Sequence, residues 1–92
     1  MPSIELIVMH SVGLHARPAA EFVKLATSYP CNIRVRNKTM DGQFVNAKSI
    51  LSVLTLGVNQ GHTIQVDTDG EGAEEALIGL QGLIVSNFGE KP

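Results

Sequence analysis

Residues 18–36 read PAAEFVKLATSYPCNIRVR, and the spacing of apolar residues in this stretch changes at Pro30. Before Pro30 the apolar residues follow the i, i+3, i+4, i+7 spacing of an amphipathic helix, with polar residues on the opposite side. These apolar residues are Ala19, Phe22, Val23 and Ala26. After Pro30 apolar and polar residues alternate, as in a strand with one face in solvent. The stretch therefore predicts a helix with Pro18 in its first turn, ended by Tyr29 and Pro30, and then a strand over 31–36.

The flanking segments repeat these two periods. Further strand patterns lie at 4–9, 43–45 and 63–68. Further helical patterns cover 47–54 and 73–84. The loop 37–42 ends in the hairpin signal Asp41-Gly42, and Gly57 ends the second helix. The order β-α-β-β-α-β-α predicts an α+β two-layer sandwich, a four-stranded antiparallel sheet covered on one face by three helices.

The composition is that of a single globular domain spanning residues 1–92, with 43% hydrophobic and 17% charged residues. The net charge of -2 leaves no basic surface for a polyanion, which argues against nucleic acid as a partner. The chain shows no apolar run of membrane-spanning length and no secretion-signal pattern, so we expect a cytoplasmic protein without membrane insertion. The single cysteine, Cys31, is expected to be a small buried hydrophobe, and no Cys/His cluster has the spacing of a metal site.

The stretch GLHARPAA at 13–20 contains the main candidate functional residues. Because Pro18 belongs in the first helical turn, His15 must lie at or just before the helix N-terminus, where unpaired backbone N–H groups favour an anion. Arg17 adds a guanidinium suited to phosphate oxygens, and Gly13 permits a close approach of the backbone. This pattern predicts that His15 accepts a phosphoryl group. The alternative is a solvated histidine at a helix end beside an unrelated arginine.

The other two histidines lack such a context. His10 ends a strand and His62 begins one, and neither has a carboxylate or cysteine at ligand spacing. Both are therefore expected to be surface residues without a chemical role.

Ser49 lies near the start of the second expected helix, where a phosphoserine would meet free N–H groups. The alternative is a plain N-cap, a role that Asn46 could also fill. The apolar residues that follow are too many for one buried stripe on a short helix, so some are expected to form an exposed docking surface unless both helix faces are covered. These residues are Ile50, Leu51, Val53, Leu54 and Leu56.

With these motifs the chain resembles the HPr family, the histidine-containing phosphocarriers of the bacterial phosphoenolpyruvate:sugar phosphotransferase system (PTS). The resemblance rests on GLHARPA at 13–19, on NAKSI at 46–50 and on the order of elements. It implies an open-faced sandwich. It also implies that His15 takes phosphate on its δ nitrogen from phospho-enzyme I and passes it to a sugar-specific EIIA domain, while Arg17 steadies the phosphate.

The same resemblance implies regulation and docking. Ser49 matches the serine that an HPr kinase/phosphorylase modifies, and a transcriptional regulator is a further partner implied for the modified protein. Ile50, Leu51 and Leu54 match the apolar docking patch beside the histidine.

The predicted function is that of a phosphocarrier, a stoichiometric relay rather than an enzyme, with no cofactor and no metal of its own. We expect a monomer that meets its partners through shallow, transient surfaces. Two alternatives stay open. One is a regulatory HPr paralogue, in the nitrogen-related branch or as a transcriptional co-regulator. The other is an α+β module that senses a small molecule.

Overall fold

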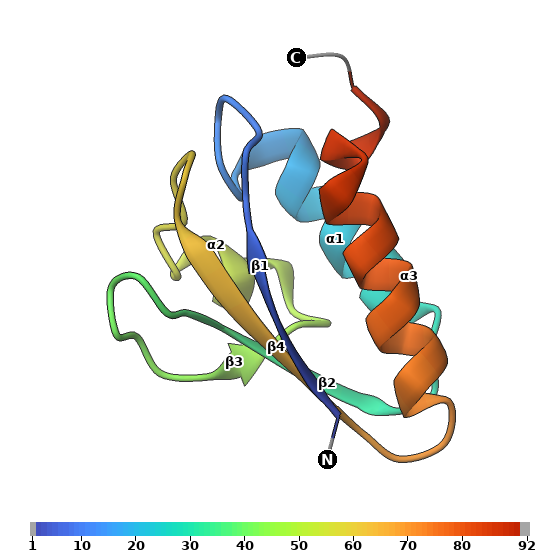
Figure 1. Cartoon of the computed structure of the whole chain (residues 1–92). Coiled ribbons are helices and arrows are strands. Elements are labelled where there is room, and N and C mark those ends of the chain that lie inside the picture. Colours follow the sequence, from blue (N-terminus) through green and yellow to red (C-terminus); the bar gives the residue numbers. More distant parts are fainter. Residues whose placement is uncertain (1, 91–92) are drawn as a thin grey trace.

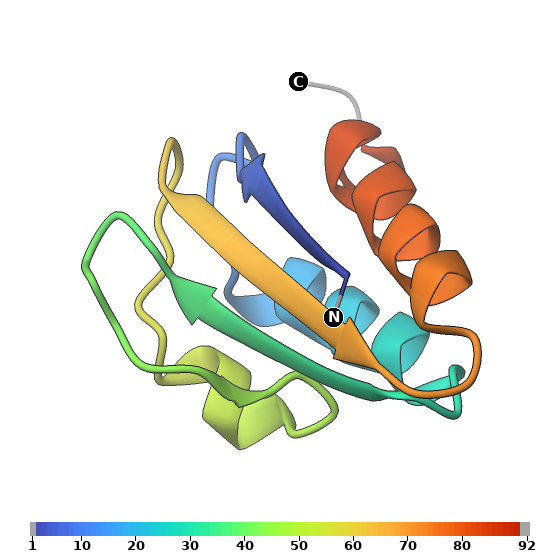
Figure 2. The same cartoon turned by 60° about the horizontal axis from the view of Figure 1, so that its bottom comes forward.

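Four strands form one antiparallel sheet in the computed structural model, which describes residues 2–90 (Figure 1, Figure 2). They are β1 (Ser3–Ile7), β2 (Asn32–Asn37), β3 (Val45–Asn46) and β4 (Thr63–Asp69). The order across the sheet is β1-β4-β2-β3, so β1 lies beside β4, which is distant from it in sequence. The helices are α1 (Ala16–Thr27), α2 (Ile50–Leu54) and α3 (Ala73–Val85). The predicted order of elements and the open-faced α+β architecture are confirmed.

One face of the sheet packs against α1 and α3 and forms the core (Figure 2). Alternate residues of β2 and β4 point to this side, and the predicted periods of the two long helices place apolar residues opposite them. The strands contribute Ile33, Val35, Ile64 and Val66, and the helices contribute Ala19, Phe22, Ala26, Ala76, Leu80 and Ile84. Cys31 is buried in the same core, as predicted. Burial of each large aliphatic side chain contributes about 1.5–3 kcal/mol, so this layer holds the site described below in place.

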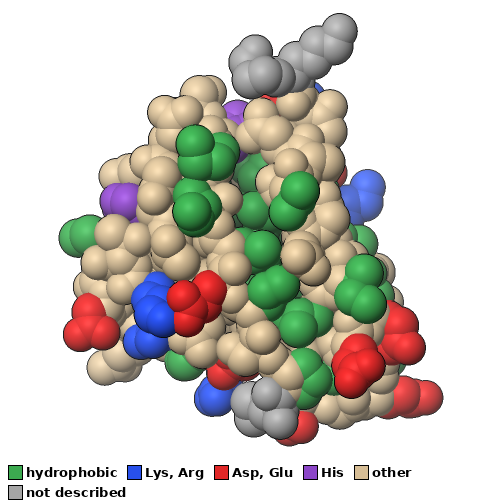
Figure 3. Space-filling model, viewed as in Figure 1, with side chains coloured by type: hydrophobic (Ala, Val, Ile, Leu, Met, Phe, Trp, Pro, Cys, Tyr) green, Lys and Arg blue, Asp and Glu red, His purple; other side chains and the backbone are tan. Residues whose placement is uncertain are grey.

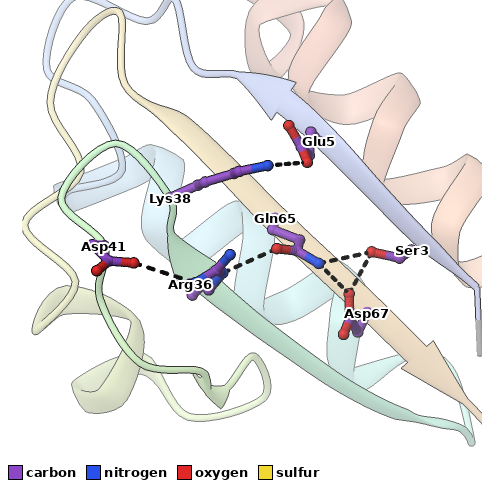
Figure 4. A network of polar contacts seen from close by, with 7 residues as sticks. All are labelled: Ser3, Glu5, Arg36, Lys38, Asp41, Gln65 and Asp67. Atoms are coloured by element: carbon purple, nitrogen blue, oxygen red, sulfur yellow. Dashed lines mark hydrogen bonds and ion pairs between the residues drawn. The ribbon is translucent and has the colours of Figure 1, made fainter.

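The other face of the sheet is polar, and its side chains bond to one another (Figure 4). Asp67 of β4 accepts hydrogen bonds from Ser3 Oγ at 2.5 Å and from Gln65 Nε2 at 3.2 Å. On its other side Asp67 Oδ2 lies 3.4 Å from a guanidinium nitrogen of Arg34. These partners cover Asp67 although it points away from the core. Acidic and basic side chains accordingly lie next to one another over the strands in Figure 3.

The second helix takes the later of its two predicted starts. Its apolar pattern extends over 47–54 with either Asn46 or Ser49 as the N-cap, and α2 begins at Ile50. The reason is that the Ala47 N–H donates to the carbonyl oxygen of Ile33 at 3.0 Å, which ties this residue to the sheet rather than to the helix.

Three smaller differences concern strand ends and the C-terminal segment. β1 ends at Ile7 rather than at residue 9, and β3 covers 45–46 rather than 43–45. A 3-10 turn, η1 (Asn87–Gly89), follows α3 without having been predicted, and its Phe88 is buried. None of the helices within residues 2–90 has the length and apolar character needed to cross a membrane.

Candidate functional site

His15 occupies the N-cap position of α1, with extended backbone angles (φ -129°, ψ 167°). Its side chain is half-buried and makes no capping hydrogen bond. The N–H groups of Ala16 and Arg17 have no hydrogen-bond acceptor among residues 2–90, and Pro18 has no N–H group. The positive end of the helix dipole and these free N–H groups favour an anion beside the imidazole.

Ala16 directly after His15 has a φ of 48°, in the left-handed region. For a residue with a Cβ atom, this backbone conformation costs about 1–2 kcal/mol of free energy. The buried side chains of Leu14 and Pro18 fix the chain on both sides of it. Backbone strain of this kind is found at functional positions, and here it lies next to the candidate phosphoacceptor.

The loop before His15 is hydrogen-bonded to the connection between α2 and β4. The Leu14 N–H donates to the carbonyl oxygen of Val58 at 2.9 Å, and both side chains are fully buried. Gly13 has a φ of 70°, and a Cβ atom there would lie only 2.1 Å from the same carbonyl oxygen. The close backbone approach that Gly13 permits is therefore made to Val58.

Arg17 is exposed near the start of α1. Its Nε lies 3.8 Å from Glu21 Oε1, one helical turn further along, and the two side chains are 72% and 42% exposed. Glu21 is not among the predicted site residues, although an acidic residue four positions after an arginine is the signal of such a pair. A phosphate at His15 and the carboxylate of Glu21 would compete for the guanidinium.

Ser49 is the N-cap of α2, and its Oγ accepts the N–H of Ser52 at 3.3 Å. Of the two predicted candidates for this cap, Ser49 is therefore the correct one, while Asn46 Oδ1 accepts the N–H of Lys48 at 2.9 Å. The geometry bears out the capping role of Ser49 in the unmodified protein.

The apolar side chains of α2 point in two directions. Val53 is fully buried, whereas Leu51 is 75% exposed and Ile50 and Leu54 are each 38% exposed. We refer to these three exposed residues as the α2 patch. Because α2 packs against α1, the α2 patch belongs to the same helical layer as His15.

The prediction that both remaining histidines lie on the surface is wrong for His10. This residue is 7% exposed, and its Nε2 lies 2.8 Å from Glu90 Oε2. His62 is half-buried, and its Nδ1 accepts the Asn59 N–H at 3.1 Å and lies 3.2 Å from Asn37 Nδ2. Local spacing could not reveal the carboxylate partner of His10, because Glu90 lies 80 positions further along the chain.

Metal ligands do not gather in the part of the chain that the structure describes. Within residues 2–90, His, Cys, Asp and Glu side chains nowhere form a group of three or more that could hold an ion. The candidate phosphoacceptor His15, the free N–H groups and Arg17 instead lie along one short segment, from Gly13 to Arg17.

Comparison with known proteins places these features in a family. The family described as "PTS HPr component phosphorylation site" matches residues 2–86. The chain is 42% identical over 91 residues to the phosphocarrier protein HPr of Pseudomonas aeruginosa, with 98% of each protein covered. It is also 46% identical over 83 residues to the multiphosphoryl transfer protein of Vibrio cholerae, covering 90% of this chain and 21% of that relative.

Structural similarity agrees with the sequence matches. The crystal structure of HPr from Thermoanaerobacter tengcongensis superposes with a TM-score of 0.94 at 40% identity, and the match covers 100% of both chains. The sheet order and the three helices are thus those of a known phosphocarrier fold. The chain belongs to the HPr family of the phosphotransferase system.

Proposed function

We propose that His15 carries a phosphoryl group, receiving it from phospho-enzyme I and passing it to an EIIA domain. The observation that carries this proposal is the N-cap position of His15, beside the N–H groups of Ala16 and Arg17 that lack an acceptor within residues 2–90. A helix N-terminus with free N–H groups is a favourable place for a phosphate. The family match, which extends over residues 2–86, supports the same role.

The proposed step is a direct phosphoryl transfer. The lone pair of a His15 ring nitrogen, the δ nitrogen by family resemblance, attacks phosphorus while the bond between phosphorus and the donor atom breaks. The donor atom keeps that electron pair, so the step involves neither oxidation nor reduction. The free N–H groups and the Arg17 guanidinium would balance the charge of the phosphoryl oxygens.

Docking is proposed to occur on the α2 patch and the adjoining end of α1. Exposed apolar side chains rimmed by polar groups are typical of protein contact surfaces, and a short-lived relay complex needs only a small one. Similarity to a multiphosphoryl transfer protein supports partners that themselves pass phosphoryl groups. We expect the protein to act as a cytoplasmic monomer.

Ser49 is proposed as a regulatory phosphorylation site for an HPr kinase/phosphorylase. A phosphate there would add about -1.5 to -2 charges directly before Ile50, the first residue of the α2 patch. Charge next to an apolar docking surface raises the desolvation cost of complex formation. Phosphorylation would therefore weaken the contact with enzyme I and favour another partner, such as a transcriptional regulator.

The test is to incubate the wild-type protein and His15→Ala with phosphoenolpyruvate and enzyme I, and to measure the phosphate bound per chain. We expect acid-labile phosphate on the wild type and none on His15→Ala. His62→Ala is the matched control, because it also removes a half-buried histidine, and it should reach the wild-type endpoint. If an enzyme I that phosphorylates a known carrier labels none of the three, the regulatory paralogue becomes the better description.

A further inference from the structure

His10 is bonded on both ring nitrogens, although it lies outside the predicted site. Its Nδ1 accepts the N–H of Val12 at 3.2 Å, and its Nε2 lies 2.8 Å from Glu90 Oε2. The ring also packs edge-on against Phe88, with centroids 5.8 Å apart and planes at 81°. The backbone amide, the carboxylate and the aromatic ring together fix the position of the His10 ring.

These contacts select one tautomer of His10. Because Nδ1 accepts a hydrogen bond it must carry a lone pair, so the ring proton lies on Nε2 and is donated to Glu90. A carboxylate on the distal nitrogen of an imidazole fixes both the tautomer and the orientation of the ring. Glu90 therefore keeps Nδ1 directed at the Val12 amide.

The C-terminal segment has an unusual backbone that brings Glu90 to His10. Asn87, Phe88 and Gly89 have φ values of 57°, 58° and 75°, all in the left-handed region. Such a run is unfavourable for residues with a Cβ atom and needs surrounding contacts to hold it. Here Phe88 is buried, and the Glu90 N–H donates to the carbonyl oxygen of Asn87 at 3.0 Å.

We propose that the His10–Glu90 pair is a brace that positions the loop carrying His15 for phosphoryl transfer, an inference that rests on the proposed function. Successive N–H groups of this loop each have a fixed acceptor. Val12 donates to His10 Nδ1, Gly13 donates to the His10 carbonyl oxygen at 2.9 Å, and Leu14 donates to Val58.

His10 thus supplies two of these three acceptors. The last donor, Leu14, directly precedes the N-cap His15. Displacing a reacting group by about 1 Å can lower a transfer rate by about 100-fold, so the order of this loop matters for transfer. His10 and Glu90 do not touch the reacting atoms and act as positioning residues.

The first test compares His10→Ala with His10→Asn. Alanine removes the acceptor of the Val12 N–H, whereas the asparagine carbonyl oxygen can accept the N–H two residues on, as in an Asx turn. We expect His10→Ala to lower the transfer rate at saturating phospho-enzyme I by about tenfold, with the half-saturating concentration unchanged. His10→Asn should restore most of the rate and the protection of the Val12 amide from hydrogen exchange.

Glu90→Ala is the second variant, because the Glu90 side chain is 35% exposed and its loss leaves the core intact. It should speed hydrogen exchange of the Val12 amide and lower the transfer rate by about threefold. Glu90→Gln still accepts a hydrogen bond from Nε2, so its exchange and transfer rates should both stay near those of the wild type. Wild-type transfer rates in both His10→Ala and Glu90→Ala would contradict the positioning role. A lower transfer rate without faster amide exchange at Val12 would also contradict it, as would a transfer rate in His10→Asn as low as in His10→Ala.

The brace and the proposed function fail in distinguishable ways. If enzyme I does not phosphorylate the wild-type protein, the function fails. The positioning role then fails with it, even if amide exchange confirms the hydrogen bond to Val12. If the wild type is phosphorylated and the variants are equally fast, only the brace fails.

Discussion

The carbonyl oxygen of Val58 lies directly against Gly13, where a Cβ atom would come within 2.1 Å of it. This contact joins the loop that carries the candidate phosphoacceptor to the connection between α2 and β4. Val58 is fully buried, so its carbonyl oxygen cannot move aside without disturbing the core.

Gly13→Ala is therefore expected to lower the free energy of unfolding by about 2–4 kcal/mol, since overpacking adds to the left-handed φ of 70°. Gly57→Ala is the control, because Gly57 has a similar φ of 64° and no atom within 4 Å of the added Cβ. The free energy of unfolding of Gly57→Ala should fall by only about 1 kcal/mol. Urea unfolding measures both values, and equal losses would show that the contact with Val58 is unimportant.

The two glycines inside α3 should respond in opposite ways to alanine. An added Cβ at Gly79 would lie 2.0 Å from Tyr29 Oη, whereas nothing lies within 4 Å of one at Gly82. Gly82→Ala should stabilise the protein by about 1 kcal/mol through helix propensity, and Gly79→Ala should destabilise it by about 1–3 kcal/mol. Thermal unfolding of Gly79→Ala in a Tyr29→Phe background should recover part of the loss. A stabilising Gly79→Ala would contradict the packing argument.

The pair between Arg17 and Glu21 predicts a charge effect on phosphoryl uptake. Glu21→Gln removes the competitor for the guanidinium, and exposed pairs of this kind are worth about 0.2–1 kcal/mol, so we expect uptake to become about two- to threefold faster at low salt. The difference should shrink at high ionic strength. Glu74→Gln makes the same charge change in the first turn of α3, away from the α1 N-terminus, and should not alter the rate (Figure 1). Equal acceleration by both variants would point to net charge alone.

Two substitutions of the N-cap residue Ser49 distinguish its effect on stability from its effect on docking. Ser49→Ala removes the acceptor for the Ser52 N–H and should cost about 1 kcal/mol of unfolding free energy. Ser49→Asp keeps an acceptor there and should retain this stability, while its charge beside the α2 patch weakens binding of enzyme I by about fivefold. Chemical unfolding and titration calorimetry measure the two effects. Undiminished binding by Ser49→Asp would argue against charge-based regulation at this position.

The parts of the fold that local patterns determine could be predicted from the sequence, and the parts that distant contacts determine could not. The strand around Ile33 follows from alternation, and the place of His15 at the start of α1 follows from Pro18 three residues later. His10 looked like a surface residue because its partner Glu90 comes from the other end of the chain. The burial of Asp67 on the open face likewise depends on Ser3 of a distant strand, 64 positions away.

The α2 patch allows a direct test of docking. Leu51 is 75% exposed, so Leu51→Ser should change the free energy of unfolding by no more than about 0.5 kcal/mol. If Leu51 is buried against enzyme I, its loss removes about 1.5 kcal/mol of binding energy and weakens the complex about tenfold. Ile78→Ser is the matched control, because Ile78 is a similarly exposed apolar residue, 68% exposed, on α3. Weaker binding by Leu51→Ser alone locates the contact on α2, whereas an equal loss in both variants, or in neither, excludes the α2 patch as the docking surface.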